Sequence, residues 1–287
     1  MRRTRRPPRL GRVTQTIRRP GDAFAQVTEL DDAELEQHAQ RLELRAADER
    51  QRAMRREYLS RIEVRDGARV LEIGCGTGPV SRELAVWPGV REVIGVDPSP
   101  FFLERARTLA VDLRNLRFEP ADGRNLPFAN ASFDLAVFHT TLCHIPDPEA
   151  ALGEAYRVLR PGGTLAAFDG DYATLTVALG PGDALQACAE AVLDSLVHDP
   201  WLVRRLRPLT ASAGFEPDRL WSHGYVESEE PRYMLAVIDL GADTLAGSGR
   251  IAEATAHALK QEARRRADTG LFFGHIAYAS LVARRPE

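Results

Sequence analysis

Three glycines stand two residues apart in the segment "VLEIGCGTGPV", which covers residues 70–80. Gly74, Gly76 and Gly78 directly follow a short apolar run that is typical of a buried strand. Glycine tolerates positive φ and has no side chain, so a ligand can lie against the backbone of such a loop. The dinucleotide fingerprint G-x-G-x-x-G fails here, because Pro79 occupies the position of its last glycine.

The acid that precedes these glycines indicates the charge of the ligand. Glu72 lies two residues before the first glycine, on the predicted strand. A pyrophosphate binds at the positive N-terminus of a helix, and an acid on the preceding strand would repel it. An ammonium or sulfonium group would instead be stabilised by Glu72, which favours a cationic nucleoside. A solvated or backbone-capping carboxylate is the alternative at this position.

Two further acids follow the next two predicted strands. Asp97 ends the second strand, 19 residues after Gly78, close to the roughly 20 expected for a ribose-binding carboxylate. A carboxylate can accept hydrogen bonds from both ribose hydroxyls. Asp122 follows the third strand, where it could accept a hydrogen bond from an adenine amine while Gly123 offers its N–H. A simple turn or helix cap is the alternative for this Asp-Gly pair.

Candidate acid–base groups lie after the fourth and fifth predicted strands. His139 follows the fourth strand and His144 comes five residues later, while "FDGDY" places Asp169, Asp171 and Tyr172 after the fifth. Histidine titrates near neutral pH, which suits a general base, although a lone histidine on an apolar strand is often a core residue. We therefore name His139, His144, Asp171 and Tyr172 as catalytic candidates, with pocket lining as the alternative for the last two.

Composition and charge exclude several classes of protein. Cys75, Cys143 and Cys188 are too few and too scattered for a disulfide framework or a zinc site, so we expect no metal and a reducing, cytoplasmic compartment. No stretch approaches the roughly 18 unbroken apolar residues of a membrane span. Residues 1–20 hold eight arginines and no acid, but no interleaved aromatic residues. We interpret them as a disordered basic arm rather than a nucleic-acid-binding segment.

Strands and helices alternate through the middle of the chain. Short apolar strands are predicted at 70–73 and 91–97, within 115–123, and at 132–140 and 164–171. Helices of roughly 10–15 residues separate them, which predicts a parallel sheet with helices on both faces. The carboxyl ends of such strands form the ligand-binding edge, so the glycine loop and the acids named above should meet there.

The flanking segments are predicted to be mainly helical. One long helix is expected over 29–62, and further helices over 183–198, 200–214, 232–246 and 250–267. A strand is expected within 215–228 and a closing strand over 271–284. We therefore predict a helical lid over 21–66 and a main domain over 67–287, with helical insertions at about 172–199 and 230–268.

Four segments together resemble a known enzyme family. "VLEIGCGTG", "VIGVDPSPFFLERAR", "ADGRNLPFANASFDLAVFHTTLCHI" and "EAYRVLRPGGTLAAFD" are similar to the class I S-adenosylmethionine-dependent methyltransferases. The similarity is strongest to the small-molecule subgroup that resembles ubiquinone and menaquinone biosynthesis enzymes (methyltransferase type 11). It covers about residues 67–170, and the flanking segments match by position only. It implies a Rossmann-like sheet of seven strands, mostly parallel, whose last strand is antiparallel.

The resemblance also implies a cofactor, a binding site and a reaction. S-adenosylmethionine would be the donor and S-adenosylhomocysteine the product. The implied donor-binding residues are Glu72, Gly74, Cys75, Gly76, Gly78, Asp97, Pro98, Phe102, Asp122, Gly123 and His139. The expected reaction is methyl transfer to a small organic acceptor by in-line displacement, in secondary or quinone-type metabolism. A general base would be needed only for an acceptor that must lose a proton.

Three other functions remain open on the sequence alone. The fold could use bound S-adenosylmethionine for non-methylating catalysis of the cyclase or decarboxylase type, or serve as a donor-binding regulatory subunit. A nucleic-acid methyltransferase is disfavoured, because "FHTTLCHI" stands where an "NPPY"-like tetrad for a flipped base would be expected. We expect a small-molecule acceptor, no membrane span, and a monomer or homodimer.

Overall fold

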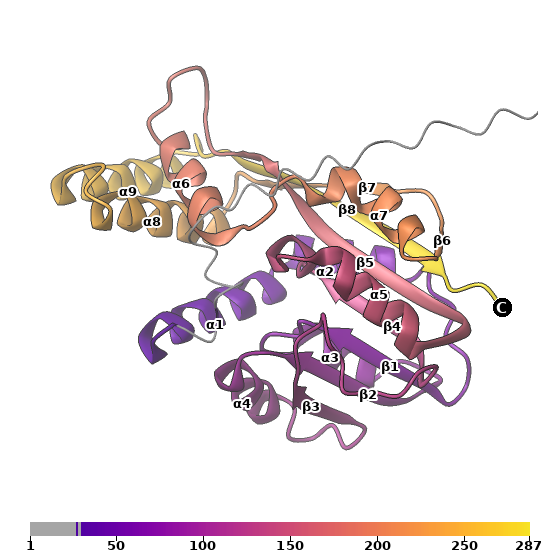
Figure 1. Ribbon diagram of the computed structural model, residues 1–287. Coiled ribbons are helices and arrows are strands. Elements are labelled where there is room, and N and C mark those ends of the chain that lie inside the picture. Colours follow the sequence, from indigo (N-terminus) through magenta and orange to yellow (C-terminus); the bar gives the residue numbers. More distant parts are fainter. Residues whose placement is uncertain (1–26, 28–29) are drawn as a thin grey trace, which may run out of the picture.

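A mixed sheet of eight strands forms the centre of the computed structural model, which describes residue 27 and residues 30–287 (Figure 1). The predicted basic arm at 1–20 lies outside the described residues. The strand order is β3-β2-β1-β4-β5-β8-β6, and β7 also pairs with β8. The strands are β1 (Ala68–Ile73), β2 (Val90–Asp97), β3 (Leu116–Pro120), β4 (Phe133–His139), β5 (Leu159–Thr176), β6 (Glu216–Pro217), β7 (Trp221–Glu227) and β8 (Gly274–Arg284).

The pairing directions confirm the predicted fold class. Strands β1 to β5 pair in parallel, and β8 runs antiparallel to β5. The described residues form eight strands rather than the predicted seven, because the expected sixth strand is divided. Its first part, β6, pairs with Ala283 and Arg284, while β7 pairs with Gly274–Ser280. Pro217 ends β6, and its missing N–H cannot continue the ladder of hydrogen bonds.

Proline begins each helix that connects the parallel strands. These helices are α3 (Pro79–Ala85), α4 (Pro100–Leu109) and α5 (Pro148–Val158). Proline suits the first helical position because an N–H there has no partner within the helix. Ser99 and Asp147 cap α4 and α5 by accepting hydrogen bonds from the backbone of Phe102 and Ala150. These local signals fix where the loops at the carboxyl edge of the sheet end.

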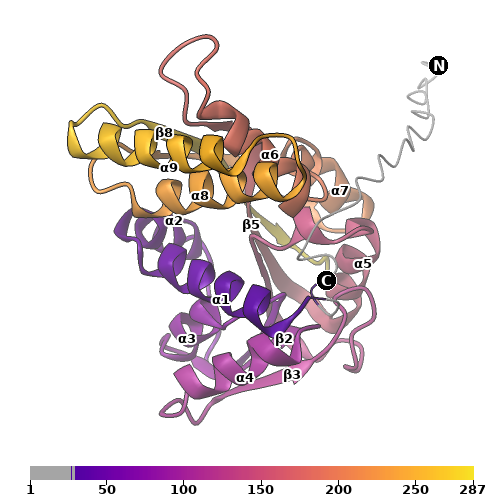
Figure 2. The ribbon, with the colours of Figure 1, turned by 90° about the vertical axis from the view of Figure 1, so that its left-hand side faces the viewer.

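The helix predicted over 29–62 is two helices, α1 (Asp32–Ala47) and α2 (Glu49–Leu59). Asp48 separates them: its backbone is extended, and its side chain accepts a 2.9 Å hydrogen bond from the N–H of Gln51. Aspartate is a favoured N-cap residue, so it can begin a new helix in the middle of a charged run. In Figure 2, α1 lies between the α8–α9 pair and α4. It thereby covers the carboxyl edge of the sheet.

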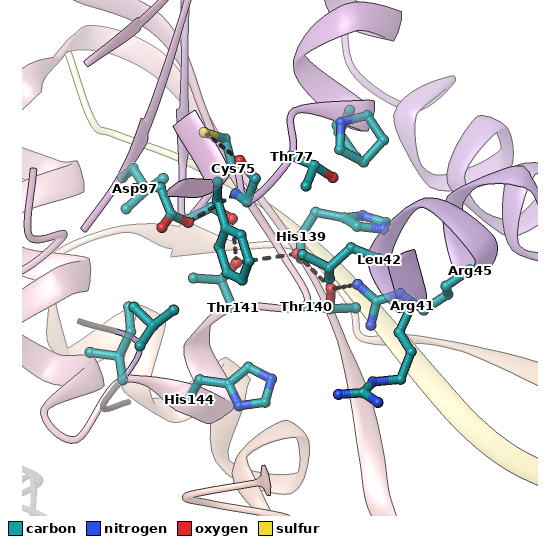
Figure 3. Close-up of a pocket in the computed structure, with 18 of the residues that line it drawn as sticks. Arg41, Leu42, Arg45, Cys75, Thr77, Asp97, His139, Thr140, Thr141 and His144 are labelled. Atoms are coloured by element: carbon teal, nitrogen blue, oxygen red, sulfur yellow. Dashed lines mark hydrogen bonds between the residues drawn. The ribbon is translucent and has the colours of Figure 1, made fainter. Parts of the chain in front are cut away.

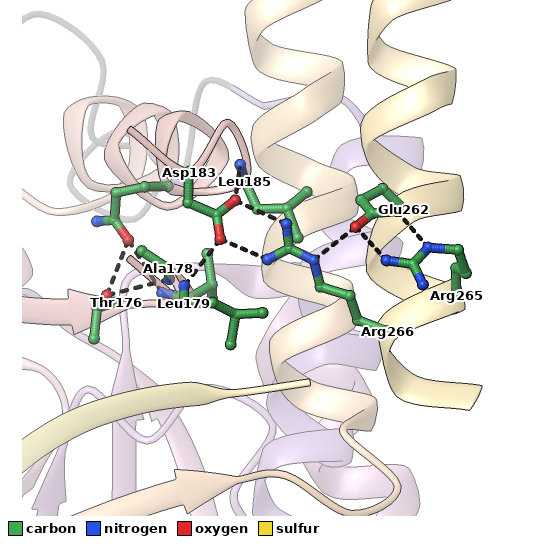
Figure 4. Close-up of polar contacts among 10 residues, drawn as sticks. Thr176, Ala178, Leu179, Asp183, Leu185, Glu262, Arg265 and Arg266 are labelled. Carbon is green, nitrogen blue, oxygen red and sulfur yellow. Dashed lines mark hydrogen bonds and ion pairs between the residues drawn. The ribbon is translucent and has the colours of Figure 1, made fainter. Parts of the chain in front are cut away.

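The remaining helices belong to the second half of the chain. They are α6 (Gln186–Leu196), α7 (Leu206–Ser212), α8 (Arg232–Gly247) and α9 (Glu253–Asp268), together with the 3-10 helices η1 (Leu142–His144) and η2 (Leu202–Arg205). Arg266 of α9 donates to both carboxylate oxygens of Asp183, at 2.6 and 3.0 Å (Figure 4). Asp183 also accepts from the backbone of Leu179 and Leu185. This ion pair therefore holds the segment before α6 against α9.

The core lies around the central strands. Val70, Leu71 and Ile73 of β1 and the segment 135–138 of β4 are almost fully buried. Strands buried on both faces are near-continuous apolar runs, which is why their positions could be predicted. Within the described residues, every helix is too short or too polar to cross a lipid bilayer.

Candidate ligand-binding and active site

A cavity of about 420 Å³ lies at the carboxyl edge of the sheet, beneath α1 (Figure 3). Its size is typical of a small-molecule or cofactor site. The predicted site residues that line it are Glu72, Gly74, Cys75, Gly76, Asp97, Pro98, Phe102, Asp122, Gly123, His139, His144 and Tyr172. Gly78 and Asp171 are not part of its lining. Residues of α1, α6 and α8 complete the walls, so the cavity extends well beyond the glycine loop.

At two of the motif positions, neighbouring side chains at the cavity leave no room for a residue larger than glycine. Gly74 and Gly76 have φ values of +73° and +52°, which L side chains rarely adopt. A Cβ on Gly74 would lie 2.1 Å from Cγ2 of Thr141, and one on Gly76 would lie 3.0 Å from Cδ1 of Leu42. The loop after β1 therefore stays bare where the chain after β4 and the helix α1 approach it.

The third motif glycine has a different role. Gly78 also has a left-handed backbone, with φ at +78°, and it precedes α3. A Cβ at this position would lie 2.6 Å from the ring of Phe118 on β3. Gly78 thus allows α3 to pack over the sheet, and it lies outside the cavity lining.

Asp97 lies at the end of β2, and backbone N–H groups hold both of its carboxylate oxygens in place. Oδ2 accepts a hydrogen bond from the N–H of Gly76, and Oδ1 accepts one from Ser99, both at 2.9 Å. The side chain is buried, and burial raises the pKa of Asp97 to about 6. Each oxygen keeps a further lone pair that can accept from a ligand hydroxyl. The geometry therefore suits a pair of vicinal hydroxyls such as those of a ribose.

The charge of Glu72 is governed by its burial at the cavity wall. Its side chain is buried, and the hydroxyl of Ser81 donates to its Oε2. Burial raises the pKa of Glu72 to about 8, so the carboxyl is mainly protonated at pH 7. Its contribution at the cavity wall is hydrogen bonding, because a neutral carboxyl offers little attraction to a sulfonium.

His139 is held between aromatic rings at the end of β4. Its ring stacks on Phe168 with 4.8 Å between centroids, and its Nδ1 lies 2.9 Å from the hydroxyl of Tyr58. Burial and the charge of Arg45 lower the pKa of His139 well below its usual value, while burial raises that of Tyr58. Both side chains are therefore neutral near pH 7. The hydroxyl of Tyr58 can donate to Nδ1 or accept from it, so this contact fits either tautomer of the neutral imidazole.

His144 and Tyr172 lie together on the far side of the cavity. Their rings meet edge to face with 6.4 Å between centroids. Asp169 is buried nearby, where burial raises its pKa and the charge of His144 opposes that shift. Backbone N–H groups of Cys143 and Gly170 hold the carboxylate of Asp169 in place. The structure thus brings together a histidine, a supporting acid and a tyrosine.

Asp171 lies outside the cavity, where it forms an ion pair with Arg204 at 3.0 Å. Most of the large aromatic side chains nearby also lie outside its lining. Among the described residues Tyr58, Tyr172, Trp201, Trp221 and Tyr225, only Tyr172 is part of the lining. Trp221 stacks between the guanidinium groups of Arg61 and Arg219. Within the described residues, no group of three or more His, Cys, Asp or Glu side chains is placed to hold a metal ion.

The helix α1 supplies two cavity residues that the sequence did not reveal. Arg41 and Arg45 line the cavity one helical turn apart, and Figure 3 shows both side chains directed into it. Arg45 donates a 2.6 Å hydrogen bond to Oγ1 of Thr140. Thr140 has a φ of +52°, which is unusual for a β-branched residue and is typical of functional sites. In the sequence, these arginines look like the many surface arginines around them.

Comparison with known proteins finds a family match in the central part of the chain. Residues 71–167 match the family model described as "Methyltransferase domain". An O-methyltransferase of Pyrenophora dematioidea is 38% identical over 116 residues, which are 39% of this chain and 43% of that protein. A demethylmenaquinone methyltransferase of Staphylococcus saprophyticus is 32% identical over 130 residues, which are 45% of this chain and 56% of that protein. The chain spans about half the length of these curated relatives.

Solved structures share the fold at low sequence identity. The [4+2]-cyclase SpnF superposes with a TM-score of 0.53 and 22% identity, over 82% of this chain and 81% of that one. At this identity the likeness shows the fold alone.

Proposed function

We propose that this chain, which contains a class I S-adenosylmethionine-dependent methyltransferase domain, methylates a small organic acceptor bound in its cavity. The observation that carries the proposal is the continuity of that cavity. It joins the bare loop and Asp97 to a chamber walled by α1, α6 and α8, where His144 and Tyr172 lie. One enclosed space can therefore hold a donor and a small acceptor in contact.

The donor half of the proposal assigns a role to each group near the loop. Asp97 holds the ribose hydroxyls, and Asp122 with Gly123 holds the adenine. Gly74 and Gly76 let the amino-acid end of the donor lie against the main chain. When bound, the donor supplies an electrophilic methyl group on a sulfonium. The support for these roles is the unused lone pairs of Asp97 and the absence of side chains at both glycines.

The chain's own contribution to transfer is mainly positioning. In-line displacement needs reacting atoms about 3–3.5 Å apart in a site that excludes water. The helices α1, α6 and α8 enclose the chamber and provide that exclusion. For an acceptor that must lose a proton, His144 accepts that proton in this proposal, and the nearby carboxylate of Asp169 stabilises the resulting charge. His139 contributes a neutral imidazole to the wall, with its Nδ1 hydrogen-bonded to the hydroxyl of Tyr58.

The metabolic setting of the proposal is secondary or quinone-type biosynthesis. Two relatives carry the names O-methyltransferase and demethylmenaquinone methyltransferase, which describe those proteins. An acceptor with a hydroxyl or a ring carbon would suit the apolar walls and the His144 side of the chamber.

Methyl-labelled S-adenosylmethionine and a library of phenols, catechols and hydroxyquinones test this function. We expect at least one acceptor to gain one methyl group by mass spectrometry, with loss of that product in the Asp97→Ala variant. A donor that binds while an acceptor is rearranged without gaining mass would instead indicate a cyclase-type activity. If neither S-adenosylmethionine nor S-adenosylhomocysteine binds in calorimetry, the proposal is wrong.

A further inference from the structure

Two arginines of the cavity have no carboxylate partner among the described residues. Arg45 donates to the hydroxyl of Thr140, and Arg41 lies 3.0 Å from Nδ1 of His38. The other cavity arginines are neutralised locally: Arg55 pairs with Glu83 at 2.5 Å, and Arg124 pairs with Asp122 at 2.7 Å.

This arrangement leaves excess positive charge in a partly dehydrated space. Burial lowers the pKa of Arg41, because a charged guanidinium loses hydration away from water. Among the carboxyls of the lining, Glu72 is mainly neutral and Asp97 is directed toward the glycine loop. An unpaired charge away from water is costly, so a site with two of them gains free energy when an anion enters.

The donor does not remove this excess. It carries one carboxylate against two cationic groups, the α-ammonium and the sulfonium, so its net charge is positive. Its carboxylate could neutralise one guanidinium only by bringing two further positive charges into the same cavity. The negative charge that neutralises the two arginines must therefore come from the methyl acceptor, the second ligand of the cavity.

The walls around the two arginines indicate the rest of that ligand. Val192 and Leu196 of α6 and Val237 and Leu240 of α8 line the chamber. Tyr233 also lines it and interacts electrostatically with both arginines. Apolar and aromatic walls with a few charged groups fix the orientation of an otherwise apolar ligand. Guanidinium groups bind carboxylate and phosphate through charge-assisted hydrogen bonds.

Building on the proposed methyl transfer, we infer that the acceptor is an anion: an apolar or aromatic molecule whose carboxylate or phosphate is held by Arg41 and Arg45. The anionic group would anchor the acceptor at α1, with its body against α6 and α8. Its reacting atom would then face the donor near His144. Arg41 and Arg45 would act as specificity-determining residues.

Binding to the full chain saturated with S-adenosylhomocysteine tests this inference without any need for turnover. Calorimetry would compare 4-hydroxybenzoate, its neutral isostere 4-hydroxybenzamide, and phenyl phosphate. We expect the acid to bind at least about tenfold more tightly than the amide, because charged hydrogen bonds are stronger than neutral ones. A tighter phenyl phosphate would identify phosphate as the preferred anion, and a weaker one would identify carboxylate.

Three variants connect the preference to the two arginines. Arg41→Gln and Arg45→Gln should each reduce the preference for acid over amide, and the double variant should remove it. Arg52→Gln, a change at an exposed residue of α2 whose guanidinium pairs with Glu49, should retain it. Thermal melting and S-adenosylhomocysteine affinity would show that each variant is folded.

The inference is overturned if no acid binds more tightly than its amide, or if the preference survives in the double variant. Loss of S-adenosylhomocysteine binding in both single variants would also overturn it, because both arginines would then serve the donor. These results are separate from failure of the proposed function, which would appear as no methylated product from any acceptor.

Discussion

The backbone N–H of Gly76 donates a 2.9 Å hydrogen bond to Oδ2 of Asp97, which joins the loop after β1 to the end of β2. The other oxygen of Asp97 holds Ser99, the residue that caps α4. One carboxylate thus fixes the glycine loop and the start of a helix, and it still has lone pairs for a ligand. The shape of the donor site depends on this single side chain.

Asp97→Ala should weaken binding of S-adenosylhomocysteine by roughly two to four orders of magnitude. Each hydrogen bond to a charged group contributes about 1.5–3 kcal/mol, and the variant would lose those to both ribose hydroxyls. Calorimetry measures the affinity directly. Asp112→Ala, at an exposed position after α4, is the control. Unaltered binding in Asp97→Ala would remove this residue from the ribose role.

Gly78→Ala should destabilise the fold more than Gly67→Ala, although the two glycines have nearly the same φ, +78° and +77°. A Cβ at Gly67 meets nothing within 4 Å, so this variant reports only the cost of a left-handed alanine, about 1–2 kcal/mol. At Gly78 the Cβ also overlaps the ring of Phe118, which should add a further 1–3 kcal/mol or so. Urea unfolding measures both. Equal losses would show that the ring of Phe118 moves aside freely.

The parallel part of the fold could be predicted because its signals are local. The apolar run before Gly74 predicts β1, and the strand that ends at Asp97 is observed where it was expected. Prolines 79, 100 and 148 each begin a helix. Because parallel strands end at one edge, the predicted donor residues on the loops had to meet there, and most of them line one cavity.

Features that depend on distant contacts could not be predicted in this way. The ionisation of Glu72 depends on its burial beneath the lid and on Ser81. The direction of Arg41 and Arg45 depends on how α1 lies across the sheet, which no local pattern encodes. The break at Asp48 did have a signal, because aspartate favours N-cap positions, but the charged run around it hid that signal.

Glu72→Gln should become more stable relative to the unmodified chain as the pH rises. Folding raises the pKa of Glu72 from its usual 4.5 to about 8, so the folded state binds the additional proton. The stability that this proton contributes is complete below pH 4.5 and is lost as the pH rises through 8. The difference between the two chains should change by on the order of 3 kcal/mol between pH 5 and pH 7. Urea unfolding at several pH values checks this.

The same variant tests whether Glu72 is charged when the donor is bound. Since the carboxyl is mainly neutral at pH 7, Glu72→Gln should bind S-adenosylmethionine within a few-fold of the unmodified chain. Glu104→Gln, an exposed change on α4, is the control for both measurements. A loss of more than tenfold for the sulfonium donor, without a similar loss for S-adenosylhomocysteine, would show that Glu72 is charged in the complex.

Arg266→Gln should destabilise the chain by about 2 kcal/mol, whereas Arg265→Gln should change stability by less than about 0.5 kcal/mol. Both arginines pair with Glu262, but only Arg266 also binds the half-buried Asp183 (Figure 4). That pairing lowers the pKa of Asp183 to about 2, so its contribution is present above pH 3.8 and is lost as the pH falls through 2. Thermal unfolding at neutral pH compares the two variants, and equal effects would contradict this role.

His144→Gln should lower kcat by roughly 10²–10⁴-fold for an acceptor that loses a proton, because such a residue contributes about that much as a general base. Donor affinity should stay unchanged, since the proposed ribose and adenine contacts are Asp97, Asp122 and Gly123 rather than His144. Turnover with an acceptor that loses a proton should therefore fall strongly in His144→Gln, whereas turnover with an acceptor that loses none should change little. His139→Gln is the matched comparison, because His139 lines the same cavity and should affect both acceptors alike. If His139→Gln slows only the acceptor that loses a proton and His144→Gln slows both alike, the two assignments must be exchanged.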